Sequence, residues 1–73
     1  MEAKIISIIE EILKVPAGSV NAETKMEDFE AWDSLAHVLI IGALEEQLGI
    51  EIPLDEAIEI TGVEEILKYA SEK

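Results

Sequence analysis

The sequence predicts an all-α fold, a small four-helix bundle with a long first loop and a short third helix. Apolar residues recur with helical spacing in three separate segments, and no segment alternates apolar and polar residues as a strand does. The chain has no cysteine, so packing of Ile, Leu and Val must hold the fold together. Because 73 residues support only one core, we expect a single domain over residues 1–73.

The first helix is expected over about residues 2–14. Its polar residues fall on one side of a helical wheel, and we expect Glu10 and Glu11 there to be solvated. Pro16 and Gly18 then end the helix. The opposite side is apolar and predicted to face the core: Ile5, Ile6, Ile8, Ile9, Ile12 and Leu13.

Residues 15–32 form a long connection without sustained periodicity. Spaced apolar side chains predict a surface crossing that is pinned to the core. We interpret Phe29 and Trp32 as loop anchors rather than as ligand-stacking residues. The expected anchors are Val20, Met26, Phe29 and Trp32.

The second helix is expected to begin at Asp33 or Ser34 and to end near residue 48. Gly49 follows as a stop signal just past the helix end. His37 lies on the core side of this helix and is expected to be structural. The core stripe on the same side comprises Ile40, Ile41, Leu44 and Leu48.

The other face of this helix is also apolar, where a monomeric bundle should be polar. It carries Leu35, Val38, Leu39 and Gly42, and it ends in Glu45 and Glu46. One interpretation is that the short third helix covers this face. The other is a partner-docking patch, which Gly42 favours, since an interior glycine costs ~1 kcal/mol relative to alanine and suits a close approach. The bordering acids suit a partner that presents Lys or Arg.

The remaining chain predicts two more helices. Pro53 favours an extended step, and a short helix over residues 55–59 with Asp55 as a cap follows. Thr61 and Glu64 have the spacing of a reciprocal capping pair. The last helix is expected over residues 62–71, with its buried face formed by Val63, Ile66, Leu67 and Ala70.

Charge and hydropathy exclude several classes of partner. Seventeen acids and five lysines give a formal net charge of -12, which repels nucleic acid and anionic lipid. The longest apolar run, residues 38–44, is far shorter than the ~18 residues that a membrane span needs. Glu27, Asp28 and Glu30 lack the spacing of a calcium loop, so no metal site is expected. We expect a cytoplasmic monomer with no nucleic-acid partner and no membrane insertion.

Ser34 is open to three interpretations. It is a first-turn residue beside a capping Asp33, or it is a nucleophile, or it is an attachment point. A nucleophile needs a general base and an oxyanion hole, but His37 is the only histidine and no G-x-S-x-G motif is present, so we do not expect an enzyme. A phosphodiester on Ser34 would lie at the positive end of a helix. Asp33 opposes that charge, which suggests that it serves a modifying enzyme.

Several motifs together resemble the acyl carrier protein family. "DSL" opens an apolar helix, "ALEEQLGIEIP" follows, and "ITGVEEIL" opens the last helix; the first helix and loop fit more loosely. The resemblance implies that Ser34 receives 4'-phosphopantetheine from coenzyme A through a phosphopantetheinyl transferase. The thiol of this arm then carries acyl or aminoacyl groups as thioesters between enzymes with basic docking surfaces. By the same resemblance, Asp33 and Leu35 flank the attachment site, and the partner-recognition helix carries Val38, Glu45 and Glu46.

The sequence also departs from the fatty-acid carriers. Acids usual in those carriers are replaced by Ala36 and Leu39, a methionine by Gly42, and a small residue by Trp32. The chain is therefore more similar to stand-alone carriers of specialised pathways, and we do not expect a primary role in fatty acid synthesis. The alternative is an unmodified acidic helical protein-interaction module whose apolar stripe binds a partner. If a carrier of this kind shelters its cargo, the expected lining is Ile40, Ala43, Ile58 and Ile60.

Overall fold

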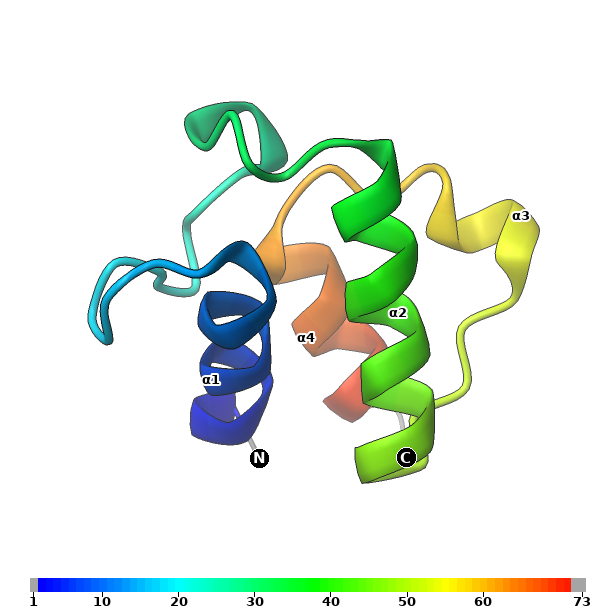
Figure 1. Ribbon diagram of the computed structural model, residues 1–73. Helices are drawn as coiled ribbons and strands as arrows, with labels where there is room; N and C mark the ends of the chain where they lie inside the picture. The colour runs from blue at the N-terminus through cyan, green and yellow to red at the C-terminus, as the bar shows by residue number, and fades with distance from the viewer. Residues whose placement is uncertain (1, 72–73) are drawn as a thin grey trace.

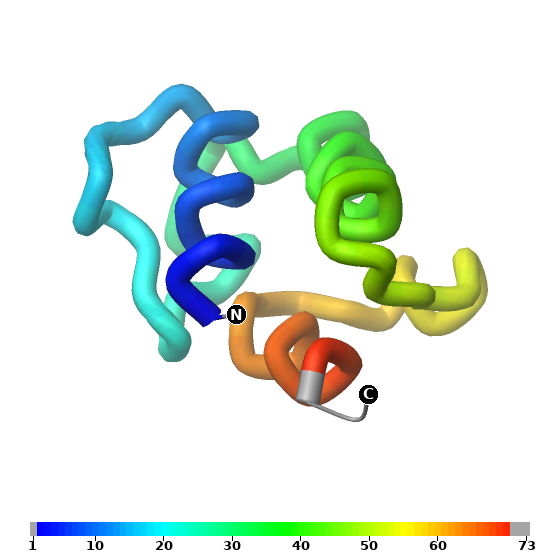
Figure 2. The backbone as a smooth tube through the Cα atoms, turned by 90° about the horizontal axis from the view of Figure 1, so that it is seen from below, coloured from blue at the N-terminus to red at the C-terminus, as the bar shows by residue number. Residues whose placement is uncertain are grey.

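The computed structural model describes residues 2–71, which form helices joined by loops. α1, α2 and α4 surround a common core, with α1 running opposite to the other two (Figure 1). Seen from below, these three helices occupy the corners of a triangle, and α3 lies beside α2 on the side away from α1 (Figure 2). The predicted all-α fold is confirmed; a single bridge, Lys25 to Gly62, is the only β pairing within residues 2–71. The elements are α1 (Glu2–Leu13), η1 (Met26–Asp28), α2 (Ser34–Leu48), α3 (Leu54–Ala57) and α4 (Val63–Ser71).

The core lies between α1, α2 and α4, and the most extensive helix contact joins α1 to α2. Both ends of α2 follow local signals. Asp33 is its N-cap, with Oδ1 accepting a hydrogen bond from the Ala36 N–H at 2.9 Å. Gly49 is its C-cap in the left-handed conformation (φ 67°), which a glycine adopts without steric cost. The most deeply buried side chains are Ile5, Ile9, Ile40, Leu44, Ile50, Val63 and Ile66.

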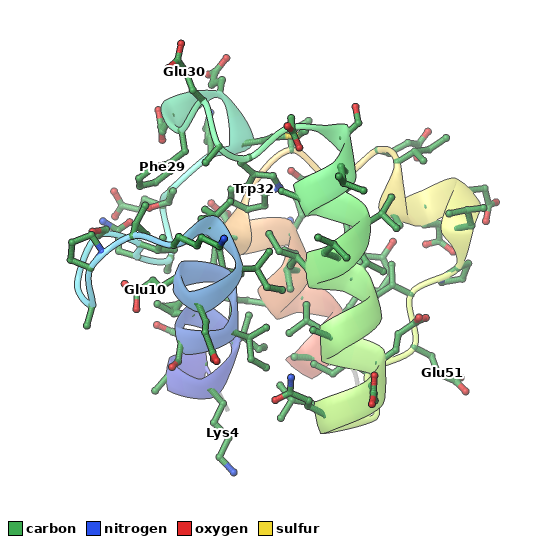
Figure 3. The ribbon with its side chains drawn as sticks, viewed as in Figure 1. Lys4, Glu10, Phe29, Glu30, Trp32 and Glu51 are labelled. Atoms are coloured by element: carbon green, nitrogen blue, oxygen red, sulfur yellow. The ribbon has the colours of Figure 1, made fainter. Side chains whose placement is uncertain are left out.

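The long first loop is pinned as predicted, with Val20 and Trp32 buried and with Met26 and Phe29 half-buried. The expectation that Glu10 is solvated is wrong. Its side chain is buried, and Oε2 accepts hydrogen bonds from the N–H groups of Gly18 at 2.8 Å and Val20 at 3.1 Å (Figure 3). The loop turns these two amides toward α1, and a carboxylate there satisfies both.

The start of α3 differs from the prediction. The helix begins at Leu54, one residue earlier than expected, and Pro53 is its N-cap without a side-chain hydrogen bond. Asp55 therefore lies inside the first turn, and its predicted role as a cap is wrong. The helix ends at Ala57, two residues before the expected end.

The capping of α4 also differs in its partner. Thr61 pairs with Glu65 rather than with Glu64: Glu65 Oε1 accepts from the Thr61 N–H at 3.0 Å and from its hydroxyl at 2.7 Å. Since α4 begins at Val63, Glu65 is its third residue, the position whose side chain reaches back past the helix start. Only half of the predicted exchange exists, shifted by one residue: Glu65 satisfies the Thr61 N–H, but the Thr61 hydroxyl donates to the Glu65 carboxylate instead of accepting from a backbone amide.

The hydrogen bonds to Glu65 predict a pH dependence. The Thr61 hydroxyl, and then its N–H, hold the pKa of Glu65 below its usual range. A lowered pKa stabilises the fold above the unfolded-state value, and this contribution is lost as the pH falls through the folded-state pKa. We expect the free energy of unfolding in urea to fall between about pH 6 and about pH 3, and to fall less in Glu65→Gln. Glu64 is exposed beside Glu65 and provides the control. If Glu64→Gln weakened the pH dependence of the free energy of unfolding as much as Glu65→Gln does, this assignment would be wrong.

Gly62 stands where the loop meets α4. The N–H of Met26 donates to Thr61 O at 2.7 Å, and the N–H of Val63 donates to Thr24 O at 2.9 Å. A Cβ on Gly62 would lie 2.9 Å from Thr24 O, which is a backbone atom and cannot rotate aside. We therefore expect Gly62→Ala to lower the free energy of unfolding by about 1–3 kcal/mol.

The matched control for Gly62 is Gly42 in α2, where an added Cβ would have no neighbour within 4 Å. Gly42→Ala is expected to raise the free energy of unfolding by up to ~1 kcal/mol through helix propensity. Equal effects of the two substitutions in urea unfolding would contradict the close contact at Gly62.

Candidate functional site

Ser34 is the first residue of α2 and is exposed at the surface. Capping of the helix is the task of Asp33, so the Ser34 hydroxyl is not needed for it. Among residues 2–71, this hydroxyl has no hydrogen-bond partner. An exposed hydroxyl therefore lies at the amino end of a 15-residue helix, where first-turn N–H groups favour an anion.

The second face of α2 is exposed, which favours the second of its two interpretations. Leu35 is 69% exposed, Val38 58% and Leu39 52%, so α3, although it stands beside Val38, leaves this face open. The exposed apolar surface continues onto α3, where Leu54 is 75% and Ile58 72% exposed. This extension was not predicted from the sequence, although a spacing of four residues places Leu54 and Ile58 on one side of a helical turn.

Acidic side chains border this surface. Glu45 and Glu46 in the later turns of α2 are exposed, as are Asp55 and Glu56 in α3. Carboxylates beside exposed apolar side chains attract a partner with cationic residues and orient it.

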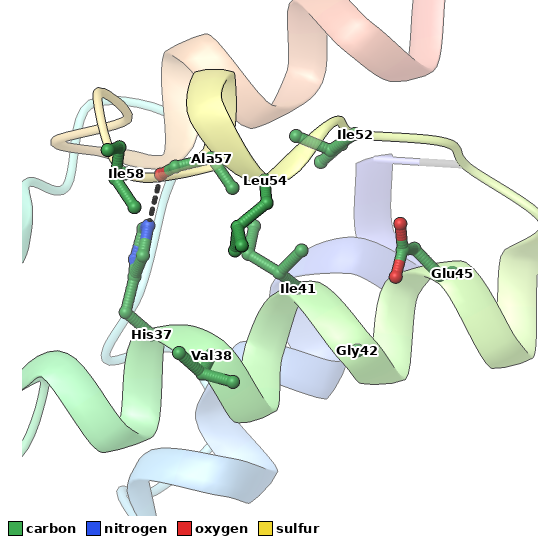
Figure 4. A pocket seen from close by; sticks show the side chains of 9 residues that line it. All are labelled: His37, Val38, Ile41, Gly42, Glu45, Ile52, Leu54, Ala57 and Ile58. Carbon is green, nitrogen blue, oxygen red and sulfur yellow. Dashed lines mark hydrogen bonds between the residues drawn. The ribbon is translucent and has the colours of Figure 1, made fainter.

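A groove of about 230 Å³ lies between α2 and α3 (Figure 4). Of the four residues expected to line a cavity for the cargo, Ile58 lines this groove, whereas Ile40, Ala43 and Ile60 do not; Ile60 borders a separate pocket beside α4. Ile40 and Ile60 are instead buried in the core. The residues that line the groove are His37, Val38, Ile41, Gly42, Glu45, Ile52, Leu54, Ala57 and Ile58.

Gly42 lines this groove without touching another part of the chain. Since an added Cβ would meet nothing within 4 Å, the fold itself does not require a glycine there. The close approach of a partner at Gly42 stays a prediction.

His37 is buried and structural, as predicted, and both of its ring nitrogens have partners. Nδ1 accepts a hydrogen bond from the indole N–H of Trp32 at 3.0 Å, and Nε2 lies 2.7 Å from the carbonyl oxygen of Ala57. The two rings stack with centroids 6.2 Å apart. With both nitrogens engaged in the core, His37 is not placed to act as a general base for Ser34.

Within the described chain, no three His, Cys, Asp or Glu side chains are grouped to hold a metal ion. None of the helices in residues 2–71 has both the length and the apolar character needed to cross a membrane.

Comparisons with known proteins agree on one family. Residues 3–70 match the family described as the phosphopantetheine attachment site. The chain is 35% identical over 74 residues to an acyl carrier protein of Rickettsia massiliae (strain Mtu5), covering 100% of this chain and 85% of that protein. A solution NMR structure of holo acyl carrier protein from Geobacter metallireducens is similar with a TM-score of 0.84 at 25% identity, over 99% of this chain and 83% of that one.

Proposed function

This chain belongs to the acyl carrier protein family, and from that premise we propose that 4'-phosphopantetheine is joined to Oγ of Ser34. The observation that supports this most is the exposed, unpartnered hydroxyl at the start of α2. Attachment joins the phosphorus of the incoming arm to Oγ, releases the nucleotide half of coenzyme A and removes the hydroxyl proton. The family are carriers and not enzymes, so the chain is the substrate of this reaction.

The neighbours of Ser34 suit this role. The free N–H groups of the first turn and the positive helix end favour a phosphodiester there. Asp33 keeps one carboxylate oxygen on the Ala36 N–H while its side chain is exposed, so it is available to the transferase. Leu35 stands beside the serine, 69% exposed, as an apolar contact for the same enzyme.

The attached arm supplies a thiol that holds acyl or aminoacyl groups as thioesters. The chain itself has no cysteine, so no second thiol competes for the cargo. We assign the docking of acyl-loading and acyl-using enzymes to the exposed face of α2. Its members are Leu35, Val38, Leu39, Gly42, Glu45 and Glu46.

Intact-mass measurement tests the attachment. The protein is incubated with coenzyme A and a broad-specificity phosphopantetheinyl transferase, and we expect a gain of one 4'-phosphopantetheine arm per chain. A mass that stays unchanged while the transferase modifies a known carrier in the same tube would overturn the proposal. It would favour the unmodified interaction module instead.

We further propose that the chain serves a specialised pathway rather than primary fatty acid synthesis. Ala36 and Leu39 stand where the fatty-acid carriers have acids. Ala36 is buried beneath the surface, whereas Leu39 is half-exposed on the docking face. Leu39 therefore presents an apolar side chain where a fatty-acid enzyme meets a carboxylate.

This pathway proposal predicts a gain of binding on restoring the charge. Leu39→Glu is expected to bind a fatty-acid ketosynthase about 2–5-fold more tightly than the unchanged chain, the usual worth of one exposed ion pair. The gain should shrink as salt is added. Calorimetric titration measures it, and Leu39→Gln is the uncharged control. If the unchanged chain already binds as tightly as a housekeeping carrier, the pathway proposal is wrong.

A further inference from the structure

The ring of His37 is bridged between two groups that together permit one protonation state. The indole N–H of Trp32 can only donate, so Nδ1 beside it must carry no proton. The carbonyl oxygen of Ala57 can only accept, so Nε2 at 2.7 Å must carry one. The surroundings therefore specify a neutral imidazole with its proton on Nε2.

A second proton on His37 is incompatible with this arrangement. It would have to bind Nδ1, where it would face the Trp32 N–H across 3.0 Å, donor against donor. The side chain is only 7% exposed, so water does not replace the lost hydrogen bond without movement. If the protonated ring leaves its two partners, its Nδ1–H no longer faces the Trp32 N–H, and the charged imidazolium can reach water.

What the neutral ring holds in place is α3. This helix has four residues, buries only Ala57, and makes no contact with another helix comparable to that of α1 with α2. Two polar contacts join it to the bundle: Ala57 O lies against His37 Nε2, and the Tyr69 hydroxyl donates a 2.6 Å hydrogen bond to Glu56. The contact with His37 joins α2 to α3 at the end of the groove nearer the start of α2 (Figure 4).

Charged groups near this contact lie on three elements. On α2 and at its cap they are Asp33 and Glu45, at the start of η1 they are Lys25 and Glu27, and in α3 and just past its end they are Asp55, Glu56 and Glu59. In the described part of the chain, none of them is hydrogen-bonded to the ring.

We propose that Trp32, His37 and Ala57 form a proton-operated latch on α3. The latch is closed while His37 is neutral, and uptake of a proton on Nδ1 breaks both hydrogen bonds and frees α3 from α2. The groove between α2 and α3 then widens at the end nearer Ser34. The latch is a property of the unmodified chain and does not depend on attachment at Ser34.

The composition makes the latch directly observable, since Trp32 is the only tryptophan and His37 the only histidine. The unmodified protein is titrated from about pH 8 to about pH 5, the range in which histidines in general change charge. We expect the fluorescence of Trp32 to change with a single midpoint while the far-UV circular dichroism stays constant. His37→Gln keeps a donor and an acceptor on its side chain but cannot titrate, and its fluorescence should stay level.

Hydrogen exchange tests whether α3 is what the latch releases. Below the fluorescence midpoint, the backbone amides of Ala57 and Ile58 should exchange about tenfold faster than in His37→Gln at the same pH. That factor corresponds to the loss of about one net hydrogen bond. The amides of Ile40 and Leu44 in the core of α2 should show no such difference.

Trp32→Phe tests whether the response of α3 depends on the indole donor, which a purely structural role of His37 would not require. It also serves as the second test if His37→Gln does not fold. Without the indole donor, a proton on Nδ1 meets no opposing N–H, and Nε2 keeps its bond to Ala57. NMR should then show the ring of His37 titrating while the α3 amides no longer respond.

Three results would overturn the proposal. They are an equal fluorescence titration in His37→Gln, an α3 response that persists in Trp32→Phe, and loss of helicity at the same midpoint.

Discussion

Replacing Ser34 with alanine is expected to abolish modification by coenzyme A and phosphopantetheinyl transferase, with no arm gained in intact-mass measurement. The expected effect is all or none, because the substitution removes the oxygen to which we propose that the arm is joined. The fold should remain intact: Ser34 is exposed and its hydroxyl supports no other described residue. The free energy of unfolding should therefore change by no more than about 0.5 kcal/mol.

Ser7 provides the matched control, since it is an exposed serine within α1. Ser7→Ala should gain one arm as the unchanged chain does. Asp33→Asn keeps a capping oxygen and should fold normally, so any slowing of its modification measures what the carboxylate does for the transferase. A Ser34→Ala chain that still gains an arm would place the attachment at another residue.

The ends of α2 and its exposed face were predictable because their signals are local. Asp33 and Gly49 specify the two ends through backbone geometry within one turn of the helix. The apolar residues Leu35, Val38 and Leu39 exceed what one core-facing stripe can hold, so they had to be covered by the third helix or to face outward, and the structure shows them exposed. Ser34 is exposed because it directly follows the capping Asp33 at the start of this helix.

The corrections concern contacts between residues distant in sequence or shifted by one helix position. Glu10 meets backbone amides eight and ten residues further along the chain, and no period in the sequence records such a contact. The pairing of Thr61 with Glu65 depends on α4 beginning at Val63, and helix ends are the least certain part of a sequence pattern.

The groove was mispredicted for a related reason. Periodicity assigns a residue to a face of its own helix, but it does not say which neighbouring helix lies opposite. α3 stands against the side of α2 that carries Val38 and Ile41, whereas Ile40 points into the main core. The contact of His37 with Ala57 spans 20 residues and became visible only in the fold.

Replacing Glu10 with alanine is expected to lower the free energy of unfolding by about 3 kcal/mol, the largest stability effect among these substitutions. The change strips the N–H groups of Gly18 and Val20 of their common acceptor. The Val20 amide is buried and costs about 1–3 kcal/mol when unsatisfied, whereas the exposed Gly18 can turn its amide to water. It also frees the loop that carries Val20 into the core. Urea unfolding, followed by circular dichroism, measures the difference.

Glu10→Gln isolates the part played by charge. Both amides bond to the same oxygen, Oε2, so a glutamine whose carbonyl oxygen takes that place keeps both hydrogen bonds and loses only their charge assistance. We therefore expect Glu10→Gln to cost about 1 kcal/mol, clearly less than Glu10→Ala. Glu11 is exposed one residue further along α1, and Glu11→Ala should have almost no effect. A Glu10→Ala protein as stable as Glu11→Ala would mean that the loop is held by its apolar anchors alone.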